Sequence, residues 1–360
     1  MTQHKVLAMN FGSTSTKVAI YEGDQEIMLQ VFRHTPEEMA HISTMEENAA
    51  FRKGVILAYL KEQGVDLNGL DAIVGRGGLM KPIEGGTYLV NEDMLRDLHS
   101  CNYGFHVCNL GGILASEIGG EIGKPAYVVD PPVVYEIDEV ASLSGHPDFP
   151  RRPLFHALNQ KAIAKRYADQ IGRRYEDLNL IVAHMGGGTT VGAHHNGRVI
   201  DVNNGLEGEG AYTGERPGTL PVLDVVRATL SGKYGTTYEQ LRHMFCMKCG
   251  LVGYTGTNDG REISRRIAEG DKKAELAYRG MAYQVAKEIG AMGAALHGKV
   301  DAILLTGGFA YDKVLMSWIE DYVNYLAPVY VFPGEDEMLA LAQGAQRVLN
   351  GREEAKVYRA

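Results

Sequence analysis

The sequence predicts an α/β fold that contains the same domain twice. Short apolar runs rich in β-branched residues alternate with longer segments of helical period, which is the pattern of an α/β protein. In addition, one arrangement occurs twice along the chain. In each copy, two strands flank a small-residue turn, and a later strand runs into a glycine-rich corner. This repetition indicates a duplicated domain.

The first copy begins with an N-terminal hairpin. We predict that it runs from Val6 to Ile20, turns at Asn10-Phe11-Gly12-Ser13, and is followed by the corner Val74-Gly75-Arg76-Gly77-Gly78. A helix is predicted between them, because several apolar side chains fall on one helical face: Phe51, Val55, Ile56, Tyr59 and Leu60. The expected strands are Val6–Met9, Val18–Tyr21, Ala72–Val74 and Tyr127–Val129.

The second copy repeats this order. Its hairpin is predicted from Leu180 to Ala193, with a turn at His184-Met185-Gly186-Gly187-Gly188, and its corner is Thr306-Gly307-Gly308. The expected strands are Leu180–Ala183, Ala302–Leu305 and Val329–Phe332. The helical period predicts one helix through Ile163, Tyr167 and Ile171, a long one from about Lys272 to Leu296, and a last one from about Glu337 to Leu349.

The chain length predicts two domains. Single hydrophobic cores stop growing near roughly 250–300 residues, and this chain has 360. We expect the crossing point in the proline-containing stretch Ser144–Pro153. The N-terminal domain then spans residues 1–150 and the C-terminal domain residues 151–336. Segment 337–360 is expected to pack back on the first domain, because no strand is predicted after its helix.

The composition argues against several classes of partner. The formal net charge of -9 opposes a nucleic-acid or anionic-membrane surface, which needs clustered positive charge. No uninterrupted apolar run reaches the ~18 residues of a membrane-spanning helix, and Met1 to Met9 contain no apolar signal core. The 4 cysteines make no disulfide framework for a chain of this length. A cytoplasmic protein without nucleic-acid or membrane partners is expected.

The cysteines raise one alternative. Cys246 and Cys249 form a C-x-x-C pair, and Cys101 with Cys108 would complete a four-sulfur metal site. The spacing of the second pair fits no common zinc finger. We therefore expect unpaired, partly buried thiols.

Both hairpin turns have the chemistry of phosphate loops. Residues 12–17 combine glycine, hydroxyl side chains and Lys17, but Thr16 stands where a P-loop needs glycine and a strand is expected to follow. Gly186, Gly187 and Gly188 let backbone amides approach an anion without a Cβ in the way. The competing interpretations are an ordinary polar hairpin for the first turn and a tight turn for the second.

The third glycine corner, Gly307-Gly308, offers a flat backbone surface for a nucleobase or ribose. A strand-to-helix turn built for packing is the alternative. Arg76 and Arg216 stand in loops shaped by glycine or proline, and guanidinium groups bind carboxylate and phosphoryl oxygens bidentately. For a single arginine, a surface ion pair is the competing interpretation.

Carboxylates and histidines complete the candidate groups. Asp130 ends a predicted strand, and Glu335-Asp336-Glu337 follows another, so either group is placed to hold magnesium through water. The acidic triplet also fits the cap of the last helix. His156 and His184 are candidates for hydrogen bonding to a transferring phosphoryl group, although most of the 12 histidines are expected to be structural.

Taken together, these segments resemble the acetate and butyrate kinase family, whose fold is shared with sugar kinases, chaperone ATPases and actin. Residues 10–17 resemble the family's opening N-x-G-S-[ST]-S-x-K phosphate loop, and residues 184–188 resemble its second loop. The resemblance implies two actin-like (ribonuclease H-like) domains with a nucleotide-binding cleft between them. Several segments resemble the butyrate branch more than the acetate branch: 74–78, 201–204, 208–210, 215–221, 257–259 and 333–337.

The resemblance also implies roles for individual residues. Arg76 and Arg216 would grip the acyl carboxylate and the moving phosphoryl group, and His156 would steady the transition state. Asp130 and one of Glu335 or Glu337 would position Mg²⁺. The implied nucleotide-contacting residues are Asn10, Gly12, Ser13, Ser15, Lys17, His184, Gly186, Gly187, Gly188, Gly307 and Gly308. Gly187 stands where acetate kinases carry asparagine, so the contact between an asparagine side chain and phosphate that is assumed for them cannot be carried over to this chain.

The expected activity is Mg²⁺-dependent, direct in-line transfer between ATP and a short-chain fatty acid, giving ADP and an acyl phosphate. Butyrate is the expected acid, with acetate, propionate and branched acids as alternatives. A nucleotide-gated binding module is the alternative from another class. A sugar kinase is disfavoured because no carboxylate general base beside a substrate hydroxyl is evident. The resemblance further implies a homo-oligomer, a dimer or larger.

Overall fold

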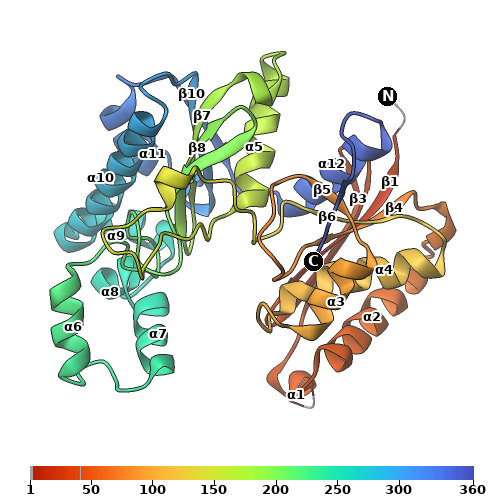
Figure 1. Cartoon of the computed structure of the whole chain (residues 1–360). Coiled ribbons are helices and arrows are strands. Elements are labelled where there is room, and N and C mark those ends of the chain that lie inside the picture. Colours follow the sequence, from red (N-terminus) through yellow and green to blue (C-terminus); the bar gives the residue numbers. More distant parts are fainter. Residues whose placement is uncertain (1–2, 41) are drawn as a thin grey trace. The chain divides into compact units, whose positions relative to one another are not determined.

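The computed structural model describes residues 3–40 and 42–360 (Figure 1). The chain divides into two compact units. Unit 1 comprises Met1–Tyr135 and Asp336–Ala360, and unit 2 comprises Glu136–Glu335. The boundary therefore lies between Tyr135 and Glu136, earlier in the chain than residue 150, where the sequence predicts it.

Unit 1 is built on a seven-stranded sheet in the order β12-β5-β6-β4-β1-β2-β3. Strands β1, β2 and β3 form an antiparallel meander, and β4 and β6 extend the sheet from β1 in parallel. The strands are β1 Lys5–Gly12, β2 Ser15–Glu22, β3 Gln25–Arg33, β4 Ala72–Arg76, β5 Thr87–Leu89, β6 Ala126–Val129 and β12 Lys356–Val357.

Helices cover both faces of this sheet, and the interior strand β1 is buried throughout Val6–Met9. Helix α4 packs on β4, β6 and β1, with α2 against it, while α12 packs on β1, β4 and β6 (Figure 1). The helices are α1 Pro36–Met39, α2 Met45–Glu62, α3 Glu92–Ser100, α4 Leu110–Glu121 and α12 Glu337–Leu349.

Strand β4 and helix α4 approach unusually closely. A Cβ on Gly75 would lie 2.0 Å from the carbonyl oxygen of Gly111, and one on Gly111 would lie 1.6 Å from the carbonyl oxygen of Arg76. No side chain fits in either place. Glycine is thus required at both positions by packing, and that packing fixes where Arg76 leaves the sheet.

Unit 2 has a five-stranded sheet in the order β11-β10-β7-β8-β9. Strands β7, β8 and β9 are antiparallel, and β10 and β11 continue from β7 in parallel. The strands are β7 Asn179–Met185, β8 Thr189–His195, β9 Arg198–Val202, β10 Ala302–Gly307 and β11 Val329–Pro333.

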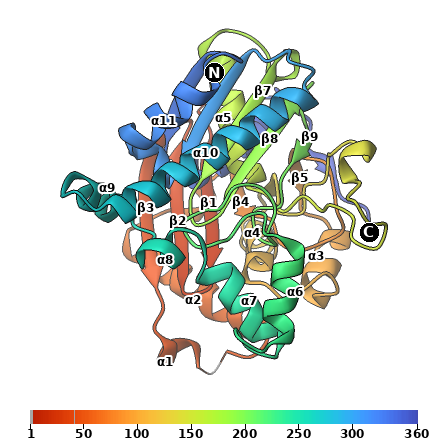
Figure 2. The same cartoon turned by 90° about the vertical axis from the view of Figure 1, so that its left-hand side faces the viewer.

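The unit 2 sheet is also covered on both faces. Helix α10 packs on β7, β8 and β9 and carries α11 beside it, as Figure 2 shows, while α5 packs on β7 and β10. The two faces bury separate clusters, with Val285 and Ile303 in one and Ile163 and Leu304 in the other. The helices are α5 Ala157–Gln170, α6 Val222–Leu230, α7 Tyr238–Met247, α8 Gly250–Thr255, α9 Gly260–Ala268, α10 Lys272–Ala295 and α11 Lys313–Val323.

The two sheets share one topology, which confirms the predicted α/β fold with a duplicated domain. The order β3-β2-β1-β4-β6 in unit 1 matches β9-β8-β7-β10-β11 in unit 2, with the same parallel and antiparallel pairings. Each copy even has a β-bulge between its second and third strands, at Ile20/Tyr21 and at Ala193/His194. Helix α12 follows β11 in the chain but belongs to unit 1.

Three details differ from the sequence-based expectation. The first hairpin turns at Ser13-Thr14, because β1 continues through Gly12 and β2 starts at Ser15. A strand does follow the last helix, since β12 pairs with β5 in parallel. Strands β3, β5 and β9 also lie outside the predicted set. No helix in the described part of the chain is long and apolar enough to cross a membrane.

Candidate active site

The first hairpin turn is supported from beneath by Arg52 of α2. The Arg52 side chain is fully buried, and its guanidinium donates to the carbonyl oxygens of Ser15 at 2.6 Å and Ser13 at 3.1 Å. It also donates to Thr16 Oγ1 at 2.9 Å and to Asn48 Oδ1 at 2.7 Å. Burial lowers the pKa of the Arg52 guanidinium to about 10, which still leaves it charged at neutral pH. The predicted phosphate loop therefore lies over a buried cation.

The other predicted residues of this loop differ in exposure. Ser13 is exposed, whereas Ser15 and Lys17 are half-buried. A Cβ on Gly12 would lie 2.7 Å from the Ser15 hydroxyl oxygen, so glycine keeps the two arms of the hairpin close. As predicted, a strand rather than a helix follows the loop.

Asn10, Arg76 and Glu337 lie together in unit 1. The Asn10 side-chain amide donates to Glu337 Oε2 at 2.6 Å, and Arg76 Nη1 lies 3.1 Å from Glu337 Oε1. The side chains come from β1, β4 and the first turn of α12. The carboxylate of Glu337 is thus held by two donors in a fixed orientation. Three residues predicted from separate motifs are brought to one place.

Asp130 directly follows β6 and is buried. Its Oδ1 accepts a hydrogen bond from the Gly86 amide at 2.7 Å, and its backbone is left-handed with a φ of 39°. Such a conformation costs free energy in a residue with a Cβ, so the surrounding contacts must impose it. Asp336 is also left-handed and occupies the cap position of α12, but its side chain makes no capping hydrogen bond.

In unit 2, the rings of His156 and His184 are stacked with their centroids 3.8 Å apart. His156 immediately precedes α5, and His184 lies near the end of β7. His156 Nδ1 lies 3.0 Å from Thr190 Oγ1, and His184 Nδ1 lies 2.8 Å from Asn159 Oδ1. His184 Nε2 is 3.8 Å from Glu335 Oε1. The structure thus brings together both histidines singled out in the sequence.

The glycine triplet between β7 and β8 makes room for Arg216. A Cβ on Gly188 would lie 1.9 Å from Arg216 Nη1, so no other residue fits there without displacing the guanidinium. Arg216 Nη1 donates to the carbonyl oxygen of Gly205 at 2.8 Å, and Thr213 Oγ1 donates to that of Gly187 at 2.5 Å. Burial lowers the pKa of the Arg216 guanidinium. The triplet and the arginine therefore form one feature.

The two glycines after β10 have different surroundings. Gly307 has a φ of 94°, and a Cβ there would lie 2.3 Å from the Met185 carbonyl oxygen, which supports the packing explanation for this position. Nothing lies within 4 Å of the Cβ position of Gly308. Gly308 is therefore the one of the pair whose backbone can be approached by a ligand.

The four cysteines are unpaired thiols. Burial raises the pKa of the Cys108 thiol to about 11 and also raises the pKa of Cys249. Among the residues that the structure describes, no group of three His, Cys, Asp or Glu side chains is arranged to hold a metal ion.

Sequence reasoning missed Arg52 beneath the first turn. It also missed Gln160 and His194 beside the second hairpin, where Gln160 Nε2 donates to Thr190 Oγ1 at 2.8 Å and His194 Nε2 lies 3.0 Å from Gln160 Oε1. Arg52 lies on the same helical stripe as the buried Ile56 and Leu60, at intervals of four residues. A charged residue on an apolar stripe is the signal that could have identified it. No comparable signal exists for Gln160 and His194, because their partners are distant in the sequence.

Comparisons with known proteins cover almost the whole chain. The model of the Acetokinase family matches residues 149–356. Butyrate kinase 2 of Clostridium acetobutylicum is 52% identical over 355 residues, which are 99% of this chain and 99% of that protein. Butyrate kinase 1 of the same organism is also 52% identical, over 99% of this chain and 100% of that protein.

Solved structures show the same fold at low identity. The acetate kinase of Porphyromonas gingivalis superimposes with a TM-score of 0.77 at 20% identity, covering 95% of this chain and 99% of that one. A propionate kinase from Francisella tularensis gives a TM-score of 0.73 at 19% identity, covering 95% and 98%. These likenesses support the two-sheet architecture described above.

Proposed function

The chain belongs to the acetokinase family, and from this premise we propose that it transfers a phosphoryl group reversibly between ATP and butyrate. It is a carboxylate phosphotransferase, and its products in the forward direction are ADP and butyryl phosphate. The observation that carries the choice of butyrate is the 52% identity to two butyrate kinases over nearly the full length of each.

The proposed reaction is a direct in-line displacement. A carboxylate oxygen of butyrate attacks the terminal phosphorus of ATP, and the bond from that phosphorus to the bridging oxygen of ADP breaks. No covalent enzyme intermediate is formed. Both reactants are anionic, so the enzyme must neutralise charge and fix the geometry of attack.

Unit 1 contains an oriented carboxylate and three cations that the proposal uses. Glu337 holds Arg76 and Asn10 by the contacts described above, which keeps the guanidinium at the end of β4. Arg52 adds positive charge beneath the turn at Ser13-Thr14. We assign Arg76 to the acyl carboxylate or phosphoryl oxygens, and the turn with Asn10, Gly12, Ser15 and Lys17 to phosphate contacts.

Unit 2 contains the second arginine, the histidines and the second loop that the proposal uses. Arg216 is half-buried and its Nη1 donates to a neutral carbonyl oxygen, so its charge is available to an anionic reactant. His156 is assigned to hydrogen bonding with the phosphoryl group. We assign the nucleotide to His184, Gly186, Gly187, Gly188, Gly307 and Gly308, with Gly308 offering the open backbone.

The proposal includes Mg²⁺, and the residues present fit it. Magnesium prefers oxygen ligands and keeps several waters, so one or two carboxylates suffice. Asp130 and Glu337 are the carboxylates that would hold it, and Glu337 is preferred over Glu335 because two donors fix its orientation. The bound ion would neutralise charge on the phosphate oxygens.

The finer assignments of location and assembly are part of the proposal. A cytoplasmic enzyme of short-chain fatty acid metabolism agrees with the unpaired state of the four cysteines. The homo-oligomer is proposed on family resemblance. Size-exclusion chromatography with light scattering tests it, and a mass equal to one chain of 39.4 kDa would contradict it.

An acyl-hydroxamate assay tests the proposed function. The enzyme is mixed with MgATP, hydroxylamine and one acid from the series acetate to hexanoate, with isobutyrate as the branched member. The expected result is the highest kcat/KM with butyrate. If kcat/KM is highest with acetate, propionate or isobutyrate, the protein is still a carboxylate kinase, but that acid is its substrate instead of butyrate. No hydroxamate with any acid, despite ATP binding, would favour the nucleotide-gated binding module.

A further inference from the structure

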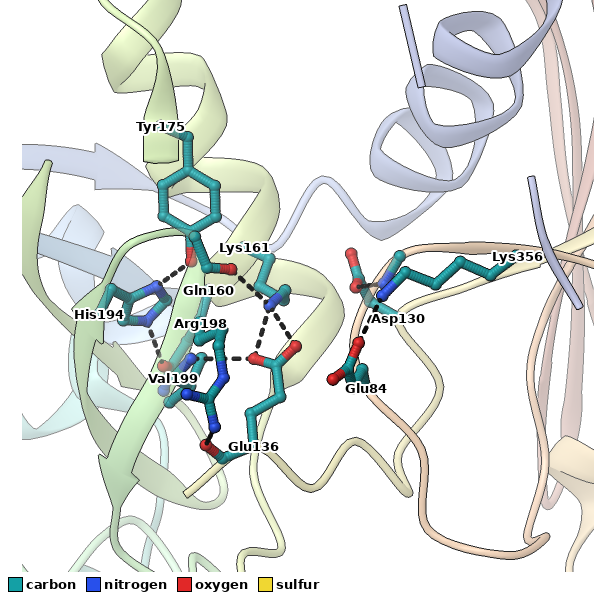
Figure 3. A network of polar contacts seen from close by, with 12 residues as sticks. Glu84, Asp130, Glu136, Gln160, Lys161, Tyr175, His194, Arg198, Val199 and Lys356 are labelled. Atoms are coloured by element: carbon teal, nitrogen blue, oxygen red, sulfur yellow. Dashed lines mark hydrogen bonds and ion pairs between the residues drawn. The ribbon is translucent and has the colours of Figure 1, made fainter. Parts of the chain in front are cut away.

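A chain of buried hydrogen bonds runs through unit 2 from Tyr175 to His156. Tyr175 Oη lies 2.7 Å from His194 Nδ1, and His194 Nε2 lies 3.0 Å from Gln160 Oε1 (Figure 3). Gln160 Nε2 lies 2.8 Å from Thr190 Oγ1, which lies 3.0 Å from His156 Nδ1. Gln160, Thr190 and His194 are fully buried. Each hydrogen in the chain therefore has a direction that the neighbouring groups determine.

The direction is set at Gln160. Its amide nitrogen also lies 3.1 Å from the carbonyl oxygen of Thr190, which can only accept. The nitrogen must face this carbonyl, so Gln160 Oε1 faces His194 and accepts from Nε2. Burial and the charge of Lys161 lower the pKa of His194 well below its ordinary value, so its imidazole is neutral. His194 Nδ1 therefore accepts from the Tyr175 hydroxyl.

The same reasoning reaches His156 through Thr190. Thr190 Oγ1 accepts a hydrogen from Gln160 Nε2, so its own hydrogen needs another acceptor. Within the described part of the chain, His156 Nδ1 is the only acceptor in hydrogen-bonding distance of this hydroxyl. A buried hydroxyl hydrogen without an acceptor costs about 1–3 kcal/mol. His156 Nδ1 is therefore the acceptor, and a neutral His156 carries its hydrogen on Nε2.

A second, shorter chain of hydrogen bonds places the ring hydrogen of His184 on Nδ1, the opposite nitrogen from that of His156. The Asn159 amide nitrogen donates to the carbonyl oxygen of Glu335 at 2.8 Å, so Asn159 Oδ1 faces His184 Nδ1. An amide oxygen can only accept, and His184 Nδ1 must donate. The first turn of α5, with Asn159 and Gln160, thus orients both stacked rings, one of which, His156, directly precedes the helix.

We propose that Gln160 and Thr190 are positioning residues that hold His156 as the Nε2–H tautomer, while Asn159 holds His184 as the Nδ1–H tautomer. This inference rests on the proposed function in one respect, namely that His156 Nε2–H is the group that donates to a phosphoryl oxygen. Fixing the tautomer in advance keeps a donor, rather than a lone pair, aimed at developing negative charge. A lone pair there would repel the phosphoryl oxygen instead.

The test is nitrogen NMR of the full-length protein labelled with ¹⁵N-histidine. Spectra at pH 8, well above the ordinary imidazole pKa of about 6.5, distinguish a protonated ring nitrogen from one with a lone pair. His156→Gln and His184→Gln identify the signals. The expected result is Nε2–H for His156 and Nδ1–H for His184. A His156 that is Nδ1–H, a rapid mixture or doubly protonated at this pH overturns the proposal.

Matched variants test the role of the positioning residues. Thr190→Val keeps the shape of the side chain and removes its hydroxyl, so His156 is expected to become a mixture of tautomers. The kcat is expected to fall about 10-fold, while the KM for ATP stays within twofold of the unchanged enzyme's value. Thr190→Ser restores both the Nε2–H signal and kcat. Gln160→Met is measured in the same way, and is used if Thr190→Val does not fold. The proposal is overturned if the His156 spectrum of Thr190→Val is unchanged, or if Thr190→Ser lacks the Nε2–H signal of His156.

The NMR result is read without substrate, so it does not depend on which acid the enzyme uses. If hydroxamate formation fails but both tautomers are as expected, the proposed function fails and the tautomer assignment stands. If the acid is phosphorylated but the tautomers differ, the positioning role fails alone.

Discussion

The β1–β2 hairpin of unit 1 and the β7–β8 hairpin of unit 2 occupy the same place in two copies of one sheet, but their supports differ. Beneath the first turn lies the buried guanidinium of Arg52, which holds the Ser13 and Ser15 carbonyl oxygens. Beside the second lies the chain from Thr190 through Gln160 to His194, whose members are neutral. The two units thus share one sheet topology, but a charged side chain supports the first turn and neutral side chains support the second.

The difference is clearest for the two buried cations. Lys161 of unit 2 is paired with Glu136, whose Oε2 lies 2.7 Å from Nζ (Figure 3). Arg52 bonds only to neutral oxygens, and among the described residues no carboxylate forms an ion pair with it. A buried charge without a counter-charge costs several kcal/mol of desolvation. The charge of Arg52 thus has no counter-charge among the described residues, whereas that of Lys161 is neutralised by Glu136, and the proposed anion at the first turn would supply the missing charge.

The largest expected effect concerns Arg76 and Arg216, which show the same contrast. Arg76 is paired with Glu337, whereas Arg216 Nη1 donates to a backbone carbonyl. Replacing either by alanine is expected to lower kcat by about 10³-fold or more, the scale of an arginine that stabilises a transferring phosphoryl group. The hydroxamate assay with butyrate measures this effect.

Stability distinguishes the two arginines. Arg216→Ala removes a partly desolvated cation, so the urea midpoint is expected to stay or rise, while Arg76→Ala leaves Glu337 without its charged partner and lowers the midpoint. The lysine variants are the controls, since lysine keeps the charge but loses the planar fork. A lower midpoint for Arg216→Ala than for Arg76→Ala would break the comparison.

The next effect concerns the paired cation of unit 2. Glu136→Gln leaves Lys161 buried without a counter-charge, and the free energy of unfolding is expected to fall by about 3 kcal/mol. Glu136 also accepts from the Val199 amide at 2.9 Å, a bond that glutamine can keep. Urea denaturation measures the change.

The double variant Glu136→Gln/Lys161→Met is the control for this prediction. Because it removes both charges, it should cost less than the sum of the single variants. Additive losses would mean that the ion pair itself contributes little and that unit 2 depends on packing at these positions.

The sequence predicted much of the fold because apolar periodicity is local. The last helix, Glu337–Leu349, was predicted with the bounds of α12, and each predicted strand lies within an observed one. Pairings between distant segments could not be predicted, such as β12 with β5. The boundary at Tyr135/Glu136 also depends on such contacts, since Glu136 binds Lys161 and Val199.

The sequence identified which residues belong to the candidate site, but it did not show how they contact one another. Motifs identified Arg216 and Gly188, whereas only the structure shows that the glycine makes room for the guanidinium. In the same way, His156 was evident from the sequence, while the hydrogen bonds that orient it come from Thr190 on another element. Spacing identifies groups, and three-dimensional contacts decide their charge and direction.

A smaller effect is expected at Arg52, which tests whether its charge is available to phosphate. Arg52→Met keeps much of the volume and removes the charge, so the Kd for MgATP is expected to rise about 10- to 100-fold, equivalent to one or two charged hydrogen bonds. Arg52→Lys keeps a cation and should recover part of the affinity. Isothermal titration with MgATP checks both.

If Arg52→Lys loses as much MgATP affinity as Arg52→Met, the loss comes from loop geometry rather than from charge. The matched control removes the other buried cation in the double variant Glu136→Gln/Lys161→Met. Its affinity for MgATP should equal that of the unchanged protein. A large loss of affinity in that double variant would remove the distinction between the two buried cations.

The smallest effect is a pH dependence that differs between the hairpins. The pKa of His194 is lowered well below 6.5 by burial, and the pKa of His34, which contacts Thr16 Oγ1, is lowered by burial and by Arg52. Below pH 6.5 the unfolded chain takes up protons that the folded chain excludes. Stability is thus fully present above pH 6.5 and is lost as the pH falls, by at most about 1.4 kcal/mol per unit for each histidine.

Urea denaturation at pH 7 and pH 5.5 measures this dependence in His194→Gln and His34→Gln. Removing His194 should reduce the pH dependence more than removing His34, because His194 is fully enclosed beside the charge of Lys161. Equal reductions would indicate that the two hairpins exclude protons equally. The larger dependence in unit 2 follows from its neutral support, since a proton on His194 would break the hydrogen bond from Tyr175 and disturb the chain to Thr190.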